Sequence, residues 1–170
     1  MNNVAQSFIA ESRRLLVKDH LPRIERCLQQ LTDEQIWWRP NPDSNSIGNL
    51  VLHLSGNIRQ WIVSGVGGSP DVRERRKEFD KQGGMSRAEL TGLLKSTIDQ
   101  ADAVLTRLDL ETLGDHRKVQ GQEVTVMEAI YHSVEHFSMH TGQIILLTKM
   151  ITGEDMKFYD FSGGLPRKTW

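Results

Sequence analysis

Three of the chain's six histidines stand four residues apart in one stretch, at His132, His136 and His140. On an α-helix, residues four apart are neighbours on the same face. Two imidazole nitrogens placed in this way can both reach one metal ion that lies roughly 2 Å from each of them. The spacing therefore predicts a metal site, and helix geometry indicates which of the three histidines point inward.

The helix that carries these histidines is predicted over residues 126–151. With a rotation of about 100° per residue, its apolar residues gather on one side, and His136 and His140 border that side. His132 falls nearer the exposed side, so we expect it behind the ligands or at the surface. Glu135 falls on the solvent face. The pair His136 and His140 is therefore the better metal pair.

Two ligands make a weak site, so a third must come from another helix. His53 lies in the middle of a predicted helix, at the edge of its apolar face and between Asn49 and Asn57. Taken alone, a histidine there is more often a hydrogen-bonded core residue than a ligand. Opposite a helix that offers an inward pair, it becomes the best third ligand, because helical bundles build metal sites from side chains on facing helices.

Three neutral imidazoles would leave the fourth position of the ion open, as expected for a catalytic rather than a structural zinc site. Zinc, nickel or ferrous iron would all accept these ligands. Such a position can bind water and lower its pKa, or bind a thiol and deprotonate it. Asn57 and Gln143 could orient the bound group by hydrogen bonds, although Gln143 could equally be a surface residue. Trp61 could line a pocket, but a tryptophan in an apolar helical pattern more often packs in the core.

Long amphipathic segments make up most of the chain, with apolar residues recurring every three or four positions. Pro22 is expected to kink or split the first segment near His20. Capping boxes are predicted at Thr32, Ser86 and Thr125. A small hairpin is expected around Gly121. We therefore predict an all-α fold, a four-helix bundle in a single domain over residues 1–170. Its long helices are predicted over residues 3–31, 46–64, 86–108 and 126–151.

Two segments lack this pattern. Residues 71–84 are dense in charge and are interpreted as a solvated connection that could contain one helical turn. Acidic residues interleave with its arginines, which argues against a nucleic-acid arm. The irregular tail, residues 154–170, carries four aromatic residues that we expect to be buried across the domain or against a partner subunit: Phe158, Tyr159, Phe161 and Trp170.

The composition is that of an ordinary globular protein, with 38% hydrophobic and 25% charged residues and a net charge of −1. So balanced a charge gives no electrostatic case for nucleic acid or anionic lipid as a partner. No apolar run approaches the roughly 18 residues of a membrane span, and the polar N-terminus does not resemble a secretion signal. Cytoplasmic location is the default expectation. Cys27, the single cysteine, lies in a helical apolar pattern and is expected to be a buried structural thiol.

Two segments resemble the DinB-like (YfiT/DinB) superfamily of bacterial four-helix bundles. One is Leu31–Trp61, with LTDEQIWWRP and SIGNLVLHL, and the other is His136–Gln143, which looks like the H-x-x-x-H-x-G-Q signature. The resemblance implies a metal bound by His53, His136 and His140, and frequent homodimers. Members include thiol S-transferases that use low-molecular-weight thiols such as bacillithiol; others are labelled metal-dependent hydrolases. The charged segment and the aromatic tail depart from the family pattern.

Alternatives remain open at this point. His132, Glu135 and His136 match H-x-x-E-H, a metalloprotease pattern, but the solvent-facing Glu135 argues against it. The favoured hypothesis is a metal-dependent enzyme that acts on a small molecule, either a thiol transferase or a hydrolase. No acidic residue within the two histidine motifs is clearly inward, which favours transfer. A non-catalytic metal-binding or stress-related bundle, and an interaction module without metal, are the other candidates.

Overall fold

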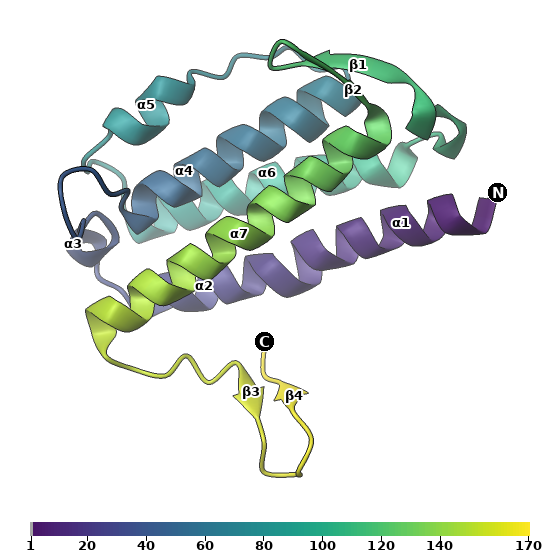
Figure 1. Cartoon of the computed structure of the whole chain (residues 1–170). Coiled ribbons are helices and arrows are strands. Elements are labelled where there is room, and N and C mark those ends of the chain that lie inside the picture. Colours follow the sequence, from purple (N-terminus) through teal and green to yellow (C-terminus); the bar gives the residue numbers. More distant parts are fainter. Residues whose placement is uncertain (1) are drawn as a thin grey trace.

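Four long helical segments run through the computed structural model, which describes residues 2–170 (Figure 1). The predicted all-α four-helix bundle is confirmed. The first segment consists of three helices that follow one another without a break, and the second of two. The segments are α1 (Asn2–Arg14) with η1 (Leu15–His20) and α2 (Leu21–Gln29); α4 (Ile47–Ile58) with η2 (Arg59–Val66); α6 (Arg87–Arg107); and α7 (Val126–Thr152).

Short elements connect these segments. The helical ones are α3 (Asp33–Ile36), α5 (Arg75–Asp80) and the 3-10 helix η3 (Leu110–Gly114). Two antiparallel hairpins are formed by β1 (His116–Val119) with β2 (Gln122–Thr125), and by β3 (Tyr159–Asp160) with β4 (Arg167–Lys168). The hairpin predicted around Gly121 is β1–β2. Gln120 and Gly121 both have positive φ angles, 52° and 80°, as a tight two-residue hairpin turn requires.

The predicted capping boxes at Thr32, Ser86 and Thr125 are all present. A fourth box begins α4, where the Ser46 side chain accepts from the backbone N–H of Asn49 and the Asn49 side chain accepts from Ser46. The sequence analysis did not identify this box, because the usual Glu or Gln is replaced by Asn. Each cap contributes about 1 kcal/mol, so these caps help to fix where the helices that carry the histidines begin.

Pro22 does not break the first segment. The chain remains helical and widens into a π-helix over Leu15–His20, with Leu21 N–H bonded to the carbonyl oxygen of Leu16. A π-helical turn shifts the hydrogen-bond pattern by one residue, which accommodates a proline that has no N–H to donate. The expected split near His20 is therefore replaced by a change of helix type.

The core is formed by apolar side chains from all four segments. Cys27 is buried, as predicted, and burial raises the pKa of its thiol to about 11. Fully buried examples are Leu16, Ile24, Leu28, Ile58, Ile62, Leu94, Ile98, Phe137 and Ile144.

The C-terminal tail lies against the first segment of its own chain. Arg26 donates hydrogen bonds to Lys157 O at 3.2 Å and Thr169 Oγ1 at 2.7 Å, and Lys168 forms an ion pair with Asp19 at 2.7 Å. Tyr159 and Phe161 remain 42% and 65% exposed. The expected burial of all four aromatic residues is wrong for these two, because a hairpin with two-residue strands covers little surface.

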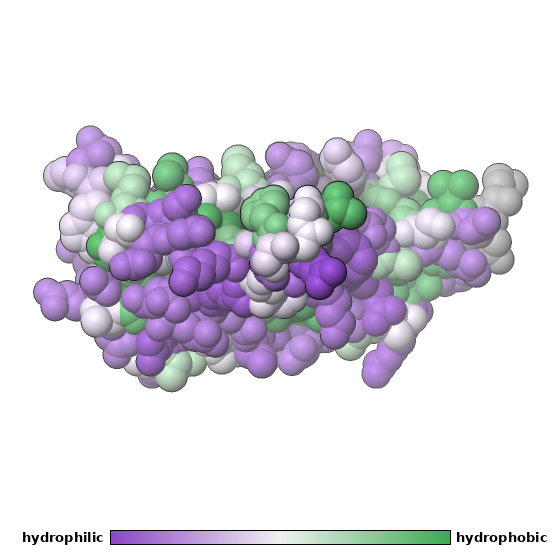
Figure 2. Space-filling view, turned by 90° about the horizontal axis from the view of Figure 1, so that it is seen from below, coloured by the Kyte–Doolittle hydropathy of each residue, from purple (hydrophilic) through white to green (hydrophobic). Residues whose placement is uncertain are grey.

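The face shown in Figure 2 is mainly hydrophilic, and its hydrophobic residues form small scattered groups. Basic and acidic residues are nearly equal in number, 21 and 22. Within residues 2–170, no helix combines the length and the apolar character that a membrane span requires.

Candidate metal centre

The α4 and α7 helices bring His53, His136 and His140 together. The ring centroids of His136 and His140 are 4.5 Å apart, and that of His53 lies 5.0 Å and 5.1 Å from them. One nitrogen from each ring lies within 4.8 Å of the others, so the three imidazoles could hold one ion. The helices thus juxtapose the three histidines that the sequence analysis selected.

Two features of this cluster fit a metal ion. His140 Nε2 is buried and has no hydrogen-bond partner, and the Nε2 atoms of His53 and His136 face each other at 2.8 Å. An unpartnered buried polar atom costs about 1–3 kcal/mol and calls for an explanation. An ion shared by the three rings would be the missing partner of His140 Nε2, since imidazole nitrogens suit zinc, nickel and ferrous iron.

The two candidate ligands on α7, His136 and His140, are neutral at physiological pH. Burial lowers the pKa of His136 to about 3, and the neighbouring rings of His140 and His53 add to this effect. Burial also lowers the pKa of His140. Only a neutral imidazole has the lone pair that a metal requires, so these two rings are ready for binding.

One hydrogen bond, from Nδ1 to Gln143, orients the ring of His140. Its Nδ1 lies 2.7 Å from Gln143 Oε1. An amide oxygen only accepts, so the proton lies on Nδ1 and the Nε2 lone pair faces the cluster. Although exposed, Gln143 therefore supports the ring of His140.

His132 lies beside the cluster but outside the group that could share an ion. Its ring packs against Trp61 in a tilted arrangement, at a centroid distance of 4.1 Å, and its Nε2 is 3.4 Å from Asn57 Nδ2. His132 is half-buried, and Trp61 covers its ring. Trp61 itself is 3% exposed and packs against Val119 and Ala129, which is the core role.

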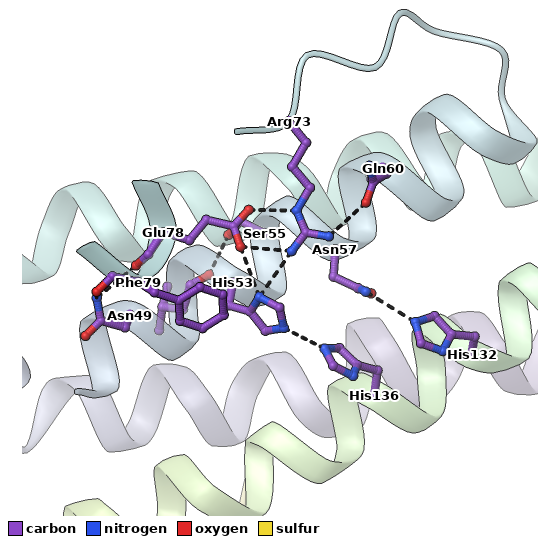
Figure 3. A network of polar contacts seen from close by, with 11 residues as sticks. Asn49, His53, Ser55, Asn57, Gln60, Arg73, Glu78, Phe79, His132 and His136 are labelled. Carbon is purple, nitrogen blue, oxygen red and sulfur yellow. Dashed lines mark hydrogen bonds and ion pairs between the residues drawn. The ribbon is translucent and has the colours of Figure 1, made fainter. Parts of the chain in front are cut away.

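Sequence reasoning missed Arg73 and Glu78. Both belong to the charged segment interpreted as solvated, yet their side chains are only 4% and 11% exposed. They form a two-point ion pair beside His53, with distances of 2.7 Å and 2.9 Å (Figure 3). Burial alone would raise the pKa of Glu78, but hydrogen bonds from Arg73 and His53 outweigh it and hold that pKa below its usual value. Alternating charges also fit a solvated helix, so the sequence offered no distinct signal.

Comparison with known proteins identifies the family. Residues 3–164 match the profile of the family described as "Protein of unknown function (DUF1572)". The chain belongs to the DUF1572 family. No match was found among curated proteins.

Solved structures share the fold of this DUF1572 chain. A conserved protein from Enterococcus faecalis aligns with a TM-score of 0.73 at 18% identity, over 85% of this chain and 97% of that one. A DinB-like protein from Bacillus cereus aligns at 0.62 and 17%, over 77% and 85% of the chains. The DinB-like protein YjoA from Bacillus subtilis aligns at 0.61 and 18%, over 80% and 87%. The DinB-like assignment is thus confirmed at the level of the fold.

The structure of the DUF1572 chain gives no support to the protease pattern. Glu135, which would be the general base, is exposed, and His132 is outside the group of possible ligands.

Two open cavities flank the histidines along α7. One, of about 580 Å³, is lined by Phe8, Met127, Tyr131, His132 and Glu135 among others. The other, of about 280 Å³, is lined by Pro40, Leu50 and Gln143 among others.

Proposed function

We propose that this protein binds one divalent metal ion through His53, His136 and His140. With this ion, the protein acts as a thiol S-transferase on small electrophiles. The observation that carries the metal assignment is the buried, unpartnered Nε2 of His140 beside the facing Nε2 atoms of the other two rings. The ligand set fits zinc, nickel and ferrous iron alike.

When bound, the ion supplies a Lewis acid that lowers the pKa of a thiol or a water molecule at its remaining position. The protein's own thiol is unsuited to be the nucleophile, because Cys27 is fully buried and its pKa is raised to about 11. The thiol must therefore come from a separate low-molecular-weight cosubstrate. Such thiols are kept reduced in the cytoplasm, where we place the activity.

The position of the acidic groups supports transfer over hydrolysis. Hydrolysis needs a residue that moves protons at the reacting centre. Glu78 is held by Arg73 and His53 on the far side of the His53 ring, and Glu135 is exposed. Glu78 is therefore engaged in an ion pair and Glu135 is directed to solvent, so neither carboxylate is placed to move this proton.

Hydrolysis is the second candidate, and His132 is the observation that favours it. The ring of His132 lies 5.3 Å from that of His136, and burial lowers its pKa, so it is a neutral base at physiological pH. In this alternative, His132 accepts the proton that a carboxylate accepts in other hydrolases.

One paired assay separates these functions. Untagged, zinc-loaded protein is mixed either with a bacterial thiol and a chloro-dinitroarene, or with a nitrophenyl ester. We expect metal-dependent conjugation of the thiol, which His53→Ala abolishes and His116→Ala, a change at an exposed histidine, leaves intact. Faster metal-dependent ester cleavage would favour the hydrolase, and activity with neither substrate would favour a non-catalytic metal-binding protein.

We also propose a homodimer formed through the outer face of α7. Five large apolar side chains are exposed along this helix. Exposed apolar patches of this kind on a protein surface mark sites of interaction. The five side chains are Met127, Tyr131, Met139, Leu146 and Met150. Light scattering is expected to give a dimer mass for the wild type and a monomer mass for Leu146→Lys; a monomeric wild type would rule the dimer out.

A further inference from the structure

The segment that carries Arg73 and Glu78 is fastened to the start of α4. Asn49 Nδ2 donates to the backbone oxygens of Glu78 at 2.8 Å and Lys81 at 2.7 Å. Arg39 Nη2 donates to Phe79 O at 3.0 Å. Figure 1 shows α5 lying along α4. These contacts place the segment against the helix that presents His53, rather than in solvent.

The Glu78 carboxylate is fixed within this segment. Arg73 donates from Nε to Oε1 at 2.7 Å and from Nη2 to Oε2 at 2.9 Å. Its Nη1 donates to Gln60 Oε1 at 2.9 Å. A forked guanidinium–carboxylate pair of this kind has a defined geometry as well as a favourable energy. The carboxylate therefore has one orientation, and that orientation faces His53 (Figure 3).

Two contacts to His53 Nδ1 require opposite protonation of that nitrogen. Glu78 Oε2 lies 3.0 Å away and can only accept, whereas Arg73 Nη2 lies 3.1 Å away and can only donate. Arg73 Nη2 already has Glu78 Oε2 as an acceptor. A carboxylate oxygen at 3.0 Å from an unprotonated ring nitrogen would be repelled. The proton therefore belongs on Nδ1, which leaves the Nε2 lone pair directed at His136.

Gly56 makes the approach of this ion pair to α4 possible. A Cβ atom at this position would overlap the Glu78 carboxylate and lie 2.9 Å from Arg73 Nε. Any larger residue at position 56 would push the pair away from His53. The requirement concerns space, since the glycine lies within the regular helix.

We propose that Glu78, held by Arg73, is a positioning residue of the metal centre, which accepts the Nδ1 proton of His53 and so keeps Nε2 turned toward the ion. A carboxylate behind a histidine ligand fixes the ring and raises its basicity. The inference rests on the proposed metal site and deepens it, because it makes the charged segment part of the centre.

The first test reads the tautomer of His53 directly in the wild-type protein. Proton–nitrogen correlation spectra of the histidine rings are recorded on chelator-treated full-length protein, with His53→Ala used to assign the signal. We expect His53 to carry its proton on Nδ1, and Glu78→Ala to increase the share of the other tautomer. A wild-type His53 protonated on Nε2 would overturn the proposal.

The second test measures zinc affinity by competition with a chelator. Glu78→Ala and Gly56→Ala are each expected to weaken binding by roughly 10- to 100-fold. The matched control is Gly92→Ala, another helical glycine, which has open space around it and should leave affinity unchanged. Because Glu78→Ala leaves Arg73 without its partner, Arg73→Gln/Glu78→Gln is also measured; it keeps an acceptor without buried charge and should bind more tightly than Glu78→Ala.

The controls separate the two levels of the account. If His53→Ala binds zinc as tightly as the wild type, the proposed metal site fails. If His53→Ala loses zinc but Glu78→Ala and Gly56→Ala retain wild-type affinity while folded, the metal site stands and the role of Glu78 is overturned.

Discussion

His53 Nε2 and His136 Nε2 lie 2.8 Å apart, although 83 positions separate the two residues in the chain. One residue belongs to α4 and the other to α7. An ion held at this point would join two helices that also contact each other through packed side chains and through Asn57 and His132. Metal binding is therefore expected to change the stability of the whole bundle as well as its chemistry.

Zinc should raise the melting temperature of the metal-free protein. A ligand present at 100 times its dissociation constant stabilises the folded state by about 2.7 kcal/mol, which corresponds to roughly 5–10 °C for a domain of this size. Circular dichroism melts are expected to show this rise in the wild type and His116→Ala, and none in His140→Ala. An equal rise in His140→Ala would mean that zinc stabilises the protein from another place.

Acid should destabilise the metal-free protein through the buried histidines. The pKa of His136 falls from 6.5 to about 3 on folding, so below pH 6.5 the unfolded state takes up a proton that the folded state refuses. The contribution of the neutral His136 ring to the free energy of unfolding is complete above this pH and is lost as the pH falls. For this half-buried ring we expect a loss of about 1–2 kcal/mol by about pH 5.

Denaturant titrations at neutral and acidic pH measure this loss. The pKa values of His140, His132 and His20 are also lowered by burial, so each adds a loss of the same sign. His136→Gln should show a shallower pH dependence than the wild type. If the free energy of unfolding changed equally with pH in the two proteins, His136 would not be the neutral ring that we assign to the folded state.

The sequence was sufficient to select His53, His136 and His140, because helical periodicity shows which side of each helix is directed toward the core. Each lies within a regular apolar pattern, and the capping boxes mark where the patterns begin. The fold followed from the same signal. Periodicity also placed Glu135 in solvent, where the structure has it.

Arg73 and Glu78 could not be found in this way, because they lie outside any apolar pattern. Their burial depends on how the segment folds back over α4 and on the space that Gly56 leaves, and both are tertiary facts. The contact between His132 and Trp61 could not be predicted for a similar reason, because helical periodicity says nothing about a side chain from a neighbouring helix. The exposure of Phe161 likewise depends on the short hairpin in which it lies.

His132 should be dispensable for the metal. His132→Ala is expected to keep about one metal ion per chain and, if the protein is a thiol transferase, to change turnover by less than roughly threefold. A loss of turnover of roughly 100-fold with the metal retained would instead indicate general acid–base catalysis and favour hydrolysis. Loss of the metal would contradict the placement of His132 outside the ligand group.

Cys27 should be nearly unreactive in the folded protein. With a thiol pKa of about 11, its thiolate fraction at about pH 8 is on the order of one in a thousand, and only the thiolate reacts. Labelling with a maleimide is expected to be at least roughly 100-fold slower than in the denatured chain. Rapid labelling of the native protein would reopen Cys27 as a nucleophile.

The central claim is that three histidines hold one metal ion, and elemental analysis of the untagged protein tests it most directly. We expect about one zinc, nickel or iron per chain in the wild type and in His116→Ala, and close to none in His53→Ala. Fewer than roughly 0.1 metal ions per chain in the wild type after exposure to all three metals, or an undiminished content in His53→Ala, would contradict the account.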